Sequence, residues 1–345
     1  MDFMSHFLSI INKYRIISII GLAKNVSKTT TLNYIIKNLK DSKLGLTSIG
    51  RDGEKYDVIT YLPKPRIYIK KGTIIATAKQ SFEVSEVKME ILKTTRFNTP
   101  IGEILILKAL SEGFIELAGP SINKHLQEIC LELKSLGCDL ILIDGAFDRR
   151  SFASPIISEA TILSTGASVS ENMKNVIDLT VHTINLLNLK SEEDQKIIEI
   201  AKKILEKGKI GIINHTNSIK LLDVQTSLDS AKNIIENLDK SSKYIVIKGA
   251  ITDKLLEDIM KSTVKYKGVK FLTEDATKLF LSSKIKEKFE KKGGILKVLN
   301  PINIIAITIN PTSPYGYEFD KNLFLNLLKK NVNVPVYDLG VNNQL

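Results

Sequence analysis

The chain of 345 residues contains no tryptophan, two cysteines and four histidines. Cys130 and Cys138 cannot form a disulfide framework and do not have the spacing of a metal-binding motif. The histidines are far apart in the sequence, so no structural metal site is expected. No run reaches the roughly 18 apolar residues that a membrane span needs. The apolar N-terminal residues lack the cleavage site of a signal peptide, and we expect a cytoplasmic protein without a membrane partner.

Arginine is scarce as well: only six of the 49 basic residues are Arg, and lysine supplies most of the net charge of +11. These lysines are scattered along predicted helix faces, whereas nucleic-acid-binding surfaces more often cluster arginine and interleave aromatic residues. We therefore expect no nucleic-acid partner. The length exceeds one ordinary core, and the apolar fraction of 43% is typical of globular proteins.

The most distinctive segment runs from Ile16 to Ile36. A β-branched apolar run ends at Gly21, a polar turn follows, and an amphipathic helix begins at Lys28. This order is that of a phosphate-binding loop, whose pattern is Gly, four residues, Gly, Lys, Ser or Thr. The residues expected to bind the phosphates of ATP are Gly21, Lys24, Asn25, Val26, Ser27, Lys28, Thr29 and Thr30.

Within this loop, Lys28 would neutralise the phosphate oxygens and the Thr29 hydroxyl would hold Mg²⁺. Ser27 departs from the pattern because it stands where the second glycine should be. If this position needs a positive φ, a residue other than glycine costs roughly 1–2 kcal/mol. We therefore expect a weaker or reshaped nucleotide site; a strand-turn-helix that binds nothing is the structural alternative.

A second candidate is Asp144, which ends the apolar run of residues 139–143. An acidic residue at this position can hold the Mg²⁺ shell directly or through water. Shortly after it, Asp148 and Arg149 would sense the γ-phosphate. The structural alternatives are a turn or cap role for Asp144 and a solvated turn for the other two.

Further carboxylates follow other predicted strands. Asp52 and Glu54 come after the strand predicted near residues 44–49, where a carboxylate would bind Mg²⁺ or substrate, and Glu116 is a weaker candidate. Asp144 and Asp52 are the expected catalytic carboxylates. In the C-terminal half, the proline-stiffened loop of residues 310–317 carries two tyrosines, and a structural turn is its favoured interpretation.

The alternation of apolar strands with amphipathic helices predicts an α/β fold with parallel strands and crossover helices. We expect a P-loop nucleotide-binding domain with a mostly parallel sheet over residues 1–205 and a second α/β domain over residues 206–345. A charged helix over residues 191–208 would connect the two. The β-rich residues on either side of Lys71 and Gly72 predict a hairpin.

Several segments resemble, in the same order, those of a known family. They are GLAKNVSKTTTLNYII, SIGRDGE, KPRIYIKKGTIIATA, LIDGAFDRRSFASP, ATILSTGASVSENM and VLNPINIIAITINPTSPYGYEFD. Together they span nearly the whole chain, which is similar to the smaller subunit of the lysine 5,6-aminomutase reactivase. The phosphate loop of that family resembles GxxKNxGKTT, so Ser27 departs from the family pattern too.

The resemblance implies an ATP- and Mg²⁺-binding subunit that acts with a MutS-like ATPase subunit. The pair would serve an adenosylcobalamin- and pyridoxal-phosphate-dependent lysine 5,6-aminomutase of lysine fermentation. Such enzymes are inactivated when the adenosyl group is lost and damaged cobalamin stays bound. With ATP, the reactivase would open the enzyme so that intact cofactor replaces the damaged one; whether this chain or its partner hydrolyses ATP stays open.

Two rival interpretations remain. The loop also resembles that of dethiobiotin-synthetase-like ligases and of molybdopterin-guanine dinucleotide accessory proteins. In such a stand-alone small-molecule enzyme, Asp52 and Glu116 would bind a substrate carboxylate or a metal. The second rival is a scaffold whose degenerate loop no longer binds nucleotide.

Overall fold

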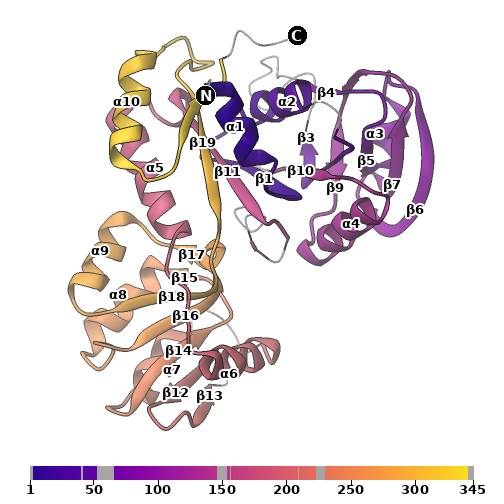
Figure 1. The fold of residues 1–345 in the computed structure, drawn as a ribbon. Coiled ribbons are helices and arrows are strands. Elements are labelled where there is room, and N and C mark those ends of the chain that lie inside the picture. Colours follow the sequence, from indigo (N-terminus) through magenta and orange to yellow (C-terminus); the bar gives the residue numbers. More distant parts are fainter. Residues whose placement is uncertain are drawn as a thin grey trace. The chain divides into compact units, whose positions relative to one another are not determined.

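The computed structural model describes residues 3–39, 42–52, 66–145, 154–155, 157–208, 210–222 and 230–340 (Figure 1). It is a mixed α/β fold with a large, mostly parallel sheet and, within these residues, ten α-helices. The chain divides into two compact units. Unit 1 comprises Met1–Val181 and Asn303–Leu345, and unit 2 comprises His182–Ile302.

Unit 1 is built on a sheet that has nine strands in the described part of the chain. In their order across the sheet these are β20 (Val336–Asp338), β19 (Ile304–Asn310), β11 (Ala160–Gly166), β1 (Ile16–Gly21), β10 (Leu140–Asp144), β2 (Leu44–Ser48), β5 (Ile74–Ala78), β7 (Gly102–Ala109) and β6 (Met89–Thr99). The strands from β20 to β5 are parallel. The long hairpin of β7 and β6 completes one edge with antiparallel pairing (Figure 1).

Helices cover both faces of this sheet. The helices that begin in unit 1 are α1 (Phe3–Ile11), α2 (Lys28–Asn38), α3 (Lys79–Glu83), α4 (Asn123–Ser135), α5 (Met173–Leu187), which leads into unit 2, and α10 (Lys321–Asn331). Successive side chains of a strand point to opposite faces. Accordingly, Leu142 packs in the core cluster that contains residues of α1 and α2, whereas Ile143 packs in the cluster that contains residues of α4.

Two short antiparallel ribbons flank the sheet. They are β3 (Gly50–Asp52) with β9 (Leu117–Gly119), and β4 (Ile67–Ile69) with β8 (Gly113–Ile115). The hairpin predicted around Lys71 and Gly72 is therefore wrong. The strands on either side of that turn, β4 and β5, pair with different partners, because β5 inserts between β2 and β7.

Unit 2 has its own five-stranded sheet in the described residues. Its order is β13 (Ile219–Leu222), β12 (Ile210–Asn214), β14 (Ser242–Ile247), β16 (Lys270–Asp275) and β18 (Ile295–Asn300). The last three strands are parallel, whereas β12 is antiparallel to both neighbours. The other elements are β15 (Ile251–Thr252), β17 (Leu279–Phe280), α6 (Gln195–Glu206), α7 (Ser230–Asn237), α8 (Asp253–Ser262) and α9 (Ser283–Lys291).

This division differs from the expected boundary at residue 205. The chain leaves unit 1 earlier, at Val181, and returns to it at Asn303. Strands β19 and β20 belong to the large sheet because β19 pairs with β11 and β20 with β19. Unit 2 is thus inserted between two strands of unit 1. No helix in the described residues is long and apolar enough to cross a membrane.

Candidate functional site: a backbone loop at the carboxyl edge of the sheet

Strand β1 lies at a point where the topology of the sheet reverses. From β1 the chain passes through α2 to β2, which lies on one side of β1. Strand β11 is the neighbour of β1 on the other side, and from β11 the sheet continues to β19, away from β2. In open α/β sheets, ligands bind outside the carboxyl ends of the strands at such a switch point. The loop from Gly21 to Ser27 lies at this place in the fold.

The backbone of this loop alternates in conformation. Asn25 (φ 58°) and Ser27 (φ 67°) have positive φ, whereas Val26 between them and Lys28 after them do not. Alternation between right- and left-handed conformations turns successive N–H groups toward one side and makes an anion-binding concavity. The left-handed conformation anticipated at Ser27 is therefore present, with serine occupying it.

The carbonyl groups of the loop accept hydrogen bonds from surrounding side chains. Lys28 Nζ donates to the Ala23 carbonyl (3.5 Å), Ser168 Oγ to that of Lys24 (2.9 Å), and Asn310 Nδ2 to that of Asn25 (3.3 Å). In a trans peptide the next N–H points opposite to the carbonyl. The N–H groups that follow these carbonyls therefore point away from the side chains that hold them.

Helix α2 begins directly after this loop. Its N-cap residue, Ser27, makes no side-chain capping hydrogen bond, and its carbonyl accepts from Thr31 N (2.9 Å) and Thr31 Oγ1 (3.0 Å). The first N–H groups of a helix have no intrahelical acceptor and carry the positive end of its dipole. The candidate residues Lys28, Thr29 and Thr30 form this first turn, so the loop and the helix start offer one set of donors for an anion.

Gly21 permits the close packing of the loop. A Cβ atom there would lie 2.6 Å from Val26 Cγ2 and 3.0 Å from Lys28 Cδ. The buried Val26 side chain and the stem of Lys28 therefore cross directly over Gly21. The predicted loop residues Gly21 and Lys28 are thus in contact range, and Lys24, at the exposed tip, is held through its carbonyl.

Asp144 ends β10, beside β1. It is fully buried, and its register partners are Ile19 of β1 and Ser48 of β2. By strand alternation it shares a face with Leu142, which is the face covered by α2. The carboxylate therefore lies on the side of the sheet on which the first turn of α2, with Thr29, begins.

The chemistry of these two residues suits a magnesium site with few protein ligands. Mg²⁺ is commonly bound by one or two carboxylates together with phosphate oxygens and water. Thr29 and Asp144 supply a hydroxyl and a carboxylate. In the described residues, no group of three or more His, Cys, Asp or Glu forms an all-protein metal site.

The remaining predicted residues lie elsewhere or outside the description. Glu54, Asp148 and Arg149 lie outside the described residues. For Asp52 the structure gives only the backbone, which is in β3 and pairs with Leu117 of β9. Glu116 precedes Leu117, so the ribbon of β3 and β9 brings the backbones of Asp52 and Glu116 close together.

The two cysteines do not supply a reactive thiolate to the candidate site. Burial raises the pKa of Cys130 to about 12 and that of Cys138 to about 11. A reactive cysteine needs a lowered pKa, because the thiolate is the nucleophile. Both thiols are buried and protonated at neutral pH.

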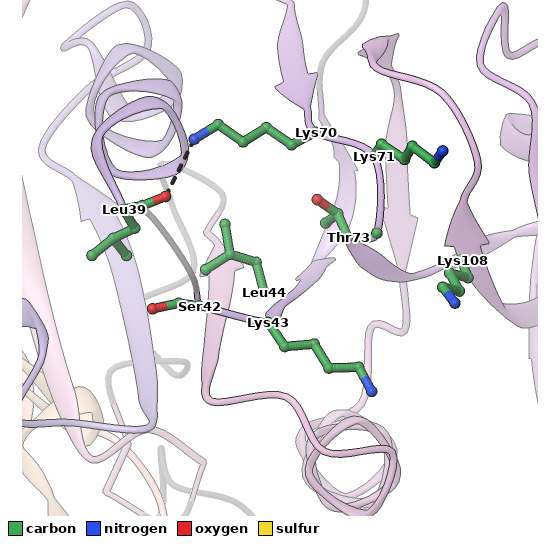
Figure 2. A pocket seen from close by; sticks show the side chains of 9 residues that line it. Leu39, Ser42, Lys43, Leu44, Lys70, Lys71, Thr73 and Lys108 are labelled. Atoms are coloured by element: carbon green, nitrogen blue, oxygen red, sulfur yellow. Dashed lines mark hydrogen bonds between the residues drawn. The ribbon is translucent and has the colours of Figure 1, made fainter.

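A basic cavity of about 600 Å³ lies at the amino ends of β2 and β5, the sheet edge opposite to the loop (Figure 2). Its lining includes Lys43, Lys70, Lys71 and Lys108 and no acidic residue. Lys70 Nζ donates to the carbonyls of Lys37 (2.9 Å) and Leu39 (3.2 Å), at the end of α2. In Figure 2 the four lysine side chains do not converge on one point, so we do not assign the function to this cavity.

Sequence reasoning missed the side chains that hold the loop from outside. Ser168 follows β11 and Asn310 ends β19, so both are far from the loop in sequence. Asn310 was noted only as the start of a tyrosine-containing loop.

Comparison with protein-family models gave no match, and no curated protein is similar enough in sequence to be matched.

Proposed function

We propose that this chain is the ATP-binding P-loop subunit of a reactivating factor for an adenosylcobalamin-dependent aminomutase. Nucleotide binding is supported by one observation above all: the loop after β1 alternates left-handed residues and turns its carbonyls toward protein side chains at the switch point of the sheet. The reactivase role is supported by the resemblance of the ordered sequence segments.

In this proposal the loop N–H groups and Lys28 bind the phosphates of ATP. Thr29 and Asp144 hold Mg²⁺, which offsets phosphate charge when it is bound. Asp52, Asp148 and Arg149 sense the γ-phosphate. Nucleotide binding favours one conformational state of the chain, and this state has a different affinity for lysine 5,6-aminomutase. A MutS-like ATPase subunit completes the complex.

The direct test is reactivation of an inactivated lysine 5,6-aminomutase. The chain and its MutS-like partner, with ATP, Mg²⁺ and fresh adenosylcobalamin, should restore activity, and K28A should abolish the restoration. Co-purification, with and without ATP, identifies the protein that binds this chain. Failure to restore activity with both subunits present would refute the reactivase role.

One observation favours a second candidate, a small-molecule ligase of the dethiobiotin-synthetase-like type. The pairing of Asp52 with Leu117 brings the backbones of Asp52 and Glu116 close together, and in this candidate the two residues would bind a substrate carboxylate or a metal. This candidate predicts that the isolated chain forms product from ATP and a small acid without any protein partner.

A further inference from the structure

The phosphate loop places two residues other than glycine in the left-handed conformation, which is unfavourable for most side chains. Asparagine tolerates the left-handed region, but serine adopts it rarely. A loop with both Asn25 and Ser27 in this region, and no glycine at either position, persists only if the surrounding structure holds it.

Two side chains from distant parts of the chain hold it: Ser168 follows β11, and Asn310 ends β19. Ser168 Oγ donates to the carbonyl of Lys24 (2.9 Å), and Asn310 Nδ2 donates to the carbonyl of Asn25 (3.3 Å). These two carbonyls belong to consecutive peptide units that flank Asn25, and the second unit ends at Val26, the residue before Ser27. Fixing both carbonyls fixes the orientation of the N–H groups of Asn25 and Val26 on the opposite side.

The two donors are themselves held in place. Asn310 Oδ1 accepts from Thr312 N (3.1 Å), which orients the amide so that its NH₂ group faces the loop. Gly166 lets Asn310 approach, because a Cβ atom at Gly166 would lie 2.9 Å from Asn310 Cβ. Beside Ser168, the Ala167 carbonyl accepts from the hydroxyl of Tyr317 (2.7 Å).

We infer that Asn310 and Ser168 are positioning residues that keep the loop in its anion-binding conformation before nucleotide arrives, in place of the missing second glycine. Of the two measurements below, only the ATP affinity depends on the proposed nucleotide function. Preorganisation of this kind removes an ordering cost from binding. The tyrosine-containing loop after β19 then has a structural role, since Tyr317 anchors the segment that carries Ser168.

The chain offers matched controls. Asn303, at the start of β19, donates its amide to the Glu159 carbonyl (3.2 Å), and Ser135 donates its hydroxyl to the Glu132 carbonyl (2.8 Å). N303A and S135A thus remove the same kinds of hydrogen bond as N310A and S168A, away from the loop.

The first measurement is amide hydrogen exchange of residues 22–28 in the nucleotide-free chain. N310A should speed exchange of this segment about three- to tenfold and S168A about threefold, while both controls stay within about twofold of the wild type. Ser168 is partly exposed, so S168A gives a readout even if N310A folds poorly.

The second measurement is the Kd of ATP·Mg²⁺. N310A should weaken binding about three- to tenfold. In an S27G background the same substitution should cost less than about threefold, because glycine adopts the left-handed conformation without help. S27G alone should leave the Kd within about twofold of the wild-type value, since Asn310 and Ser168 already hold the wild-type loop.

Equal exchange in N310A and N303A would overturn the inference. So would an unchanged effect of N310A in the S27G background. If the wild type binds no ATP but exchange of residues 22–28 responds to N310A and S168A as expected, the positioning role stands and the proposed function falls.

Discussion

Each unit ends a buried parallel strand in a buried aspartate: Asp144 ends β10 in unit 1, and Asp275 ends β16 in unit 2. In unit 2 the carboxylate accepts from the N–H and the hydroxyl of Thr277 and so caps the following turn. In unit 1, Asp144 lies beside β1 and on the face where α2 begins. The same sequence pattern therefore serves a local cap in one unit and a candidate ligand site in the other.

The helix starts differ in the same way. In unit 2, α8 and α9 begin with side-chain caps: the Thr252 hydroxyl accepts from Leu255 N, and the Ser282 hydroxyl accepts from Ile285 N. In unit 1, α2 begins at the left-handed Ser27 without a side-chain cap. A capped start satisfies its N–H groups locally, whereas an uncapped start above a concave loop presents them to a ligand. This difference supports the proposal that nucleotide binds in unit 1.

The largest effect that tests this comparison is expected at Lys28. K28A should weaken ATP binding about ten- to one-hundredfold, because it removes a charged donor to phosphate. K254A is the matched control, since Lys254 is exposed in the first turn of the capped helix α8. Equilibrium titration measures both variants; equal affinities for wild type and K28A would contradict the assignment.

The paired aspartates give the second test. D144N should weaken binding of ATP in the presence of Mg²⁺ about tenfold and leave metal-free ATP binding nearly unchanged, because it removes one negative ligand. D275N should leave both affinities unchanged, since Asp275 caps a turn in unit 2. A loss of affinity in D275N similar to that in D144N would refute the comparison.

A third test concerns an ion pair in unit 2 between the buried Glu192 and the partly exposed Lys270. Glu192, which is 7% exposed, lies 3.5 Å from Lys270 Nζ, and Lys270 Nζ donates to the Tyr244 hydroxyl at 3.0 Å. E192Q should lower the free energy of unfolding of unit 2 by about 1–3 kcal/mol without changing ATP affinity. E287Q, which breaks an exposed pair with Lys291 in α9, should cost less than about 0.5 kcal/mol.

The same pair makes stability depend on pH. Burial by itself raises the pKa of Glu192, but two backbone N–H groups, a tyrosine hydroxyl and the Lys270 charge together hold this pKa below its ordinary value. Because the folded-state pKa is lowered, the stabilisation is present above the unfolded pKa of about 4.3 and is lost as the pH falls through the folded value. Acid unfolding curves should therefore be steeper for wild type than for E192Q.

The smallest effect is expected at Ser27. S27G should raise the free energy of unfolding of unit 1 by no more than about 1–2 kcal/mol, because glycine relieves the left-handed conformation but also increases the freedom of the unfolded chain. Thermal unfolding measures the change. A loss of more than about 1 kcal/mol in S27G would contradict strain at Ser27, because it would exceed what the added freedom of the unfolded chain accounts for.

Local patterns predicted much of unit 1 near the candidate loop. The strand before Gly21, the helix that begins at Lys28, and the buried strand that ends at Asp144 are all confirmed. Each depends on short-range periodicity and on turn residues, which are written locally in the sequence. The positive φ at Ser27 could also be anticipated, because the motif requires it.

Long-range pairing was not predictable in the same way. The hairpin around Gly72 was wrong because its two strands joined different sheets. Periodicity does not say which strand pairs with which.

By itself the sequence determined where the chain forms a strand, a turn and a helix around Lys28, because those preferences act over a few residues. Only the tertiary structure decided that Ser168 and Asn310, which lie 144 and 285 positions from their acceptor residues, would hold that turn. The reason is physical: β11 and β19 reach the loop by pairing in one parallel sheet, and such pairing joins residues at any separation along the chain.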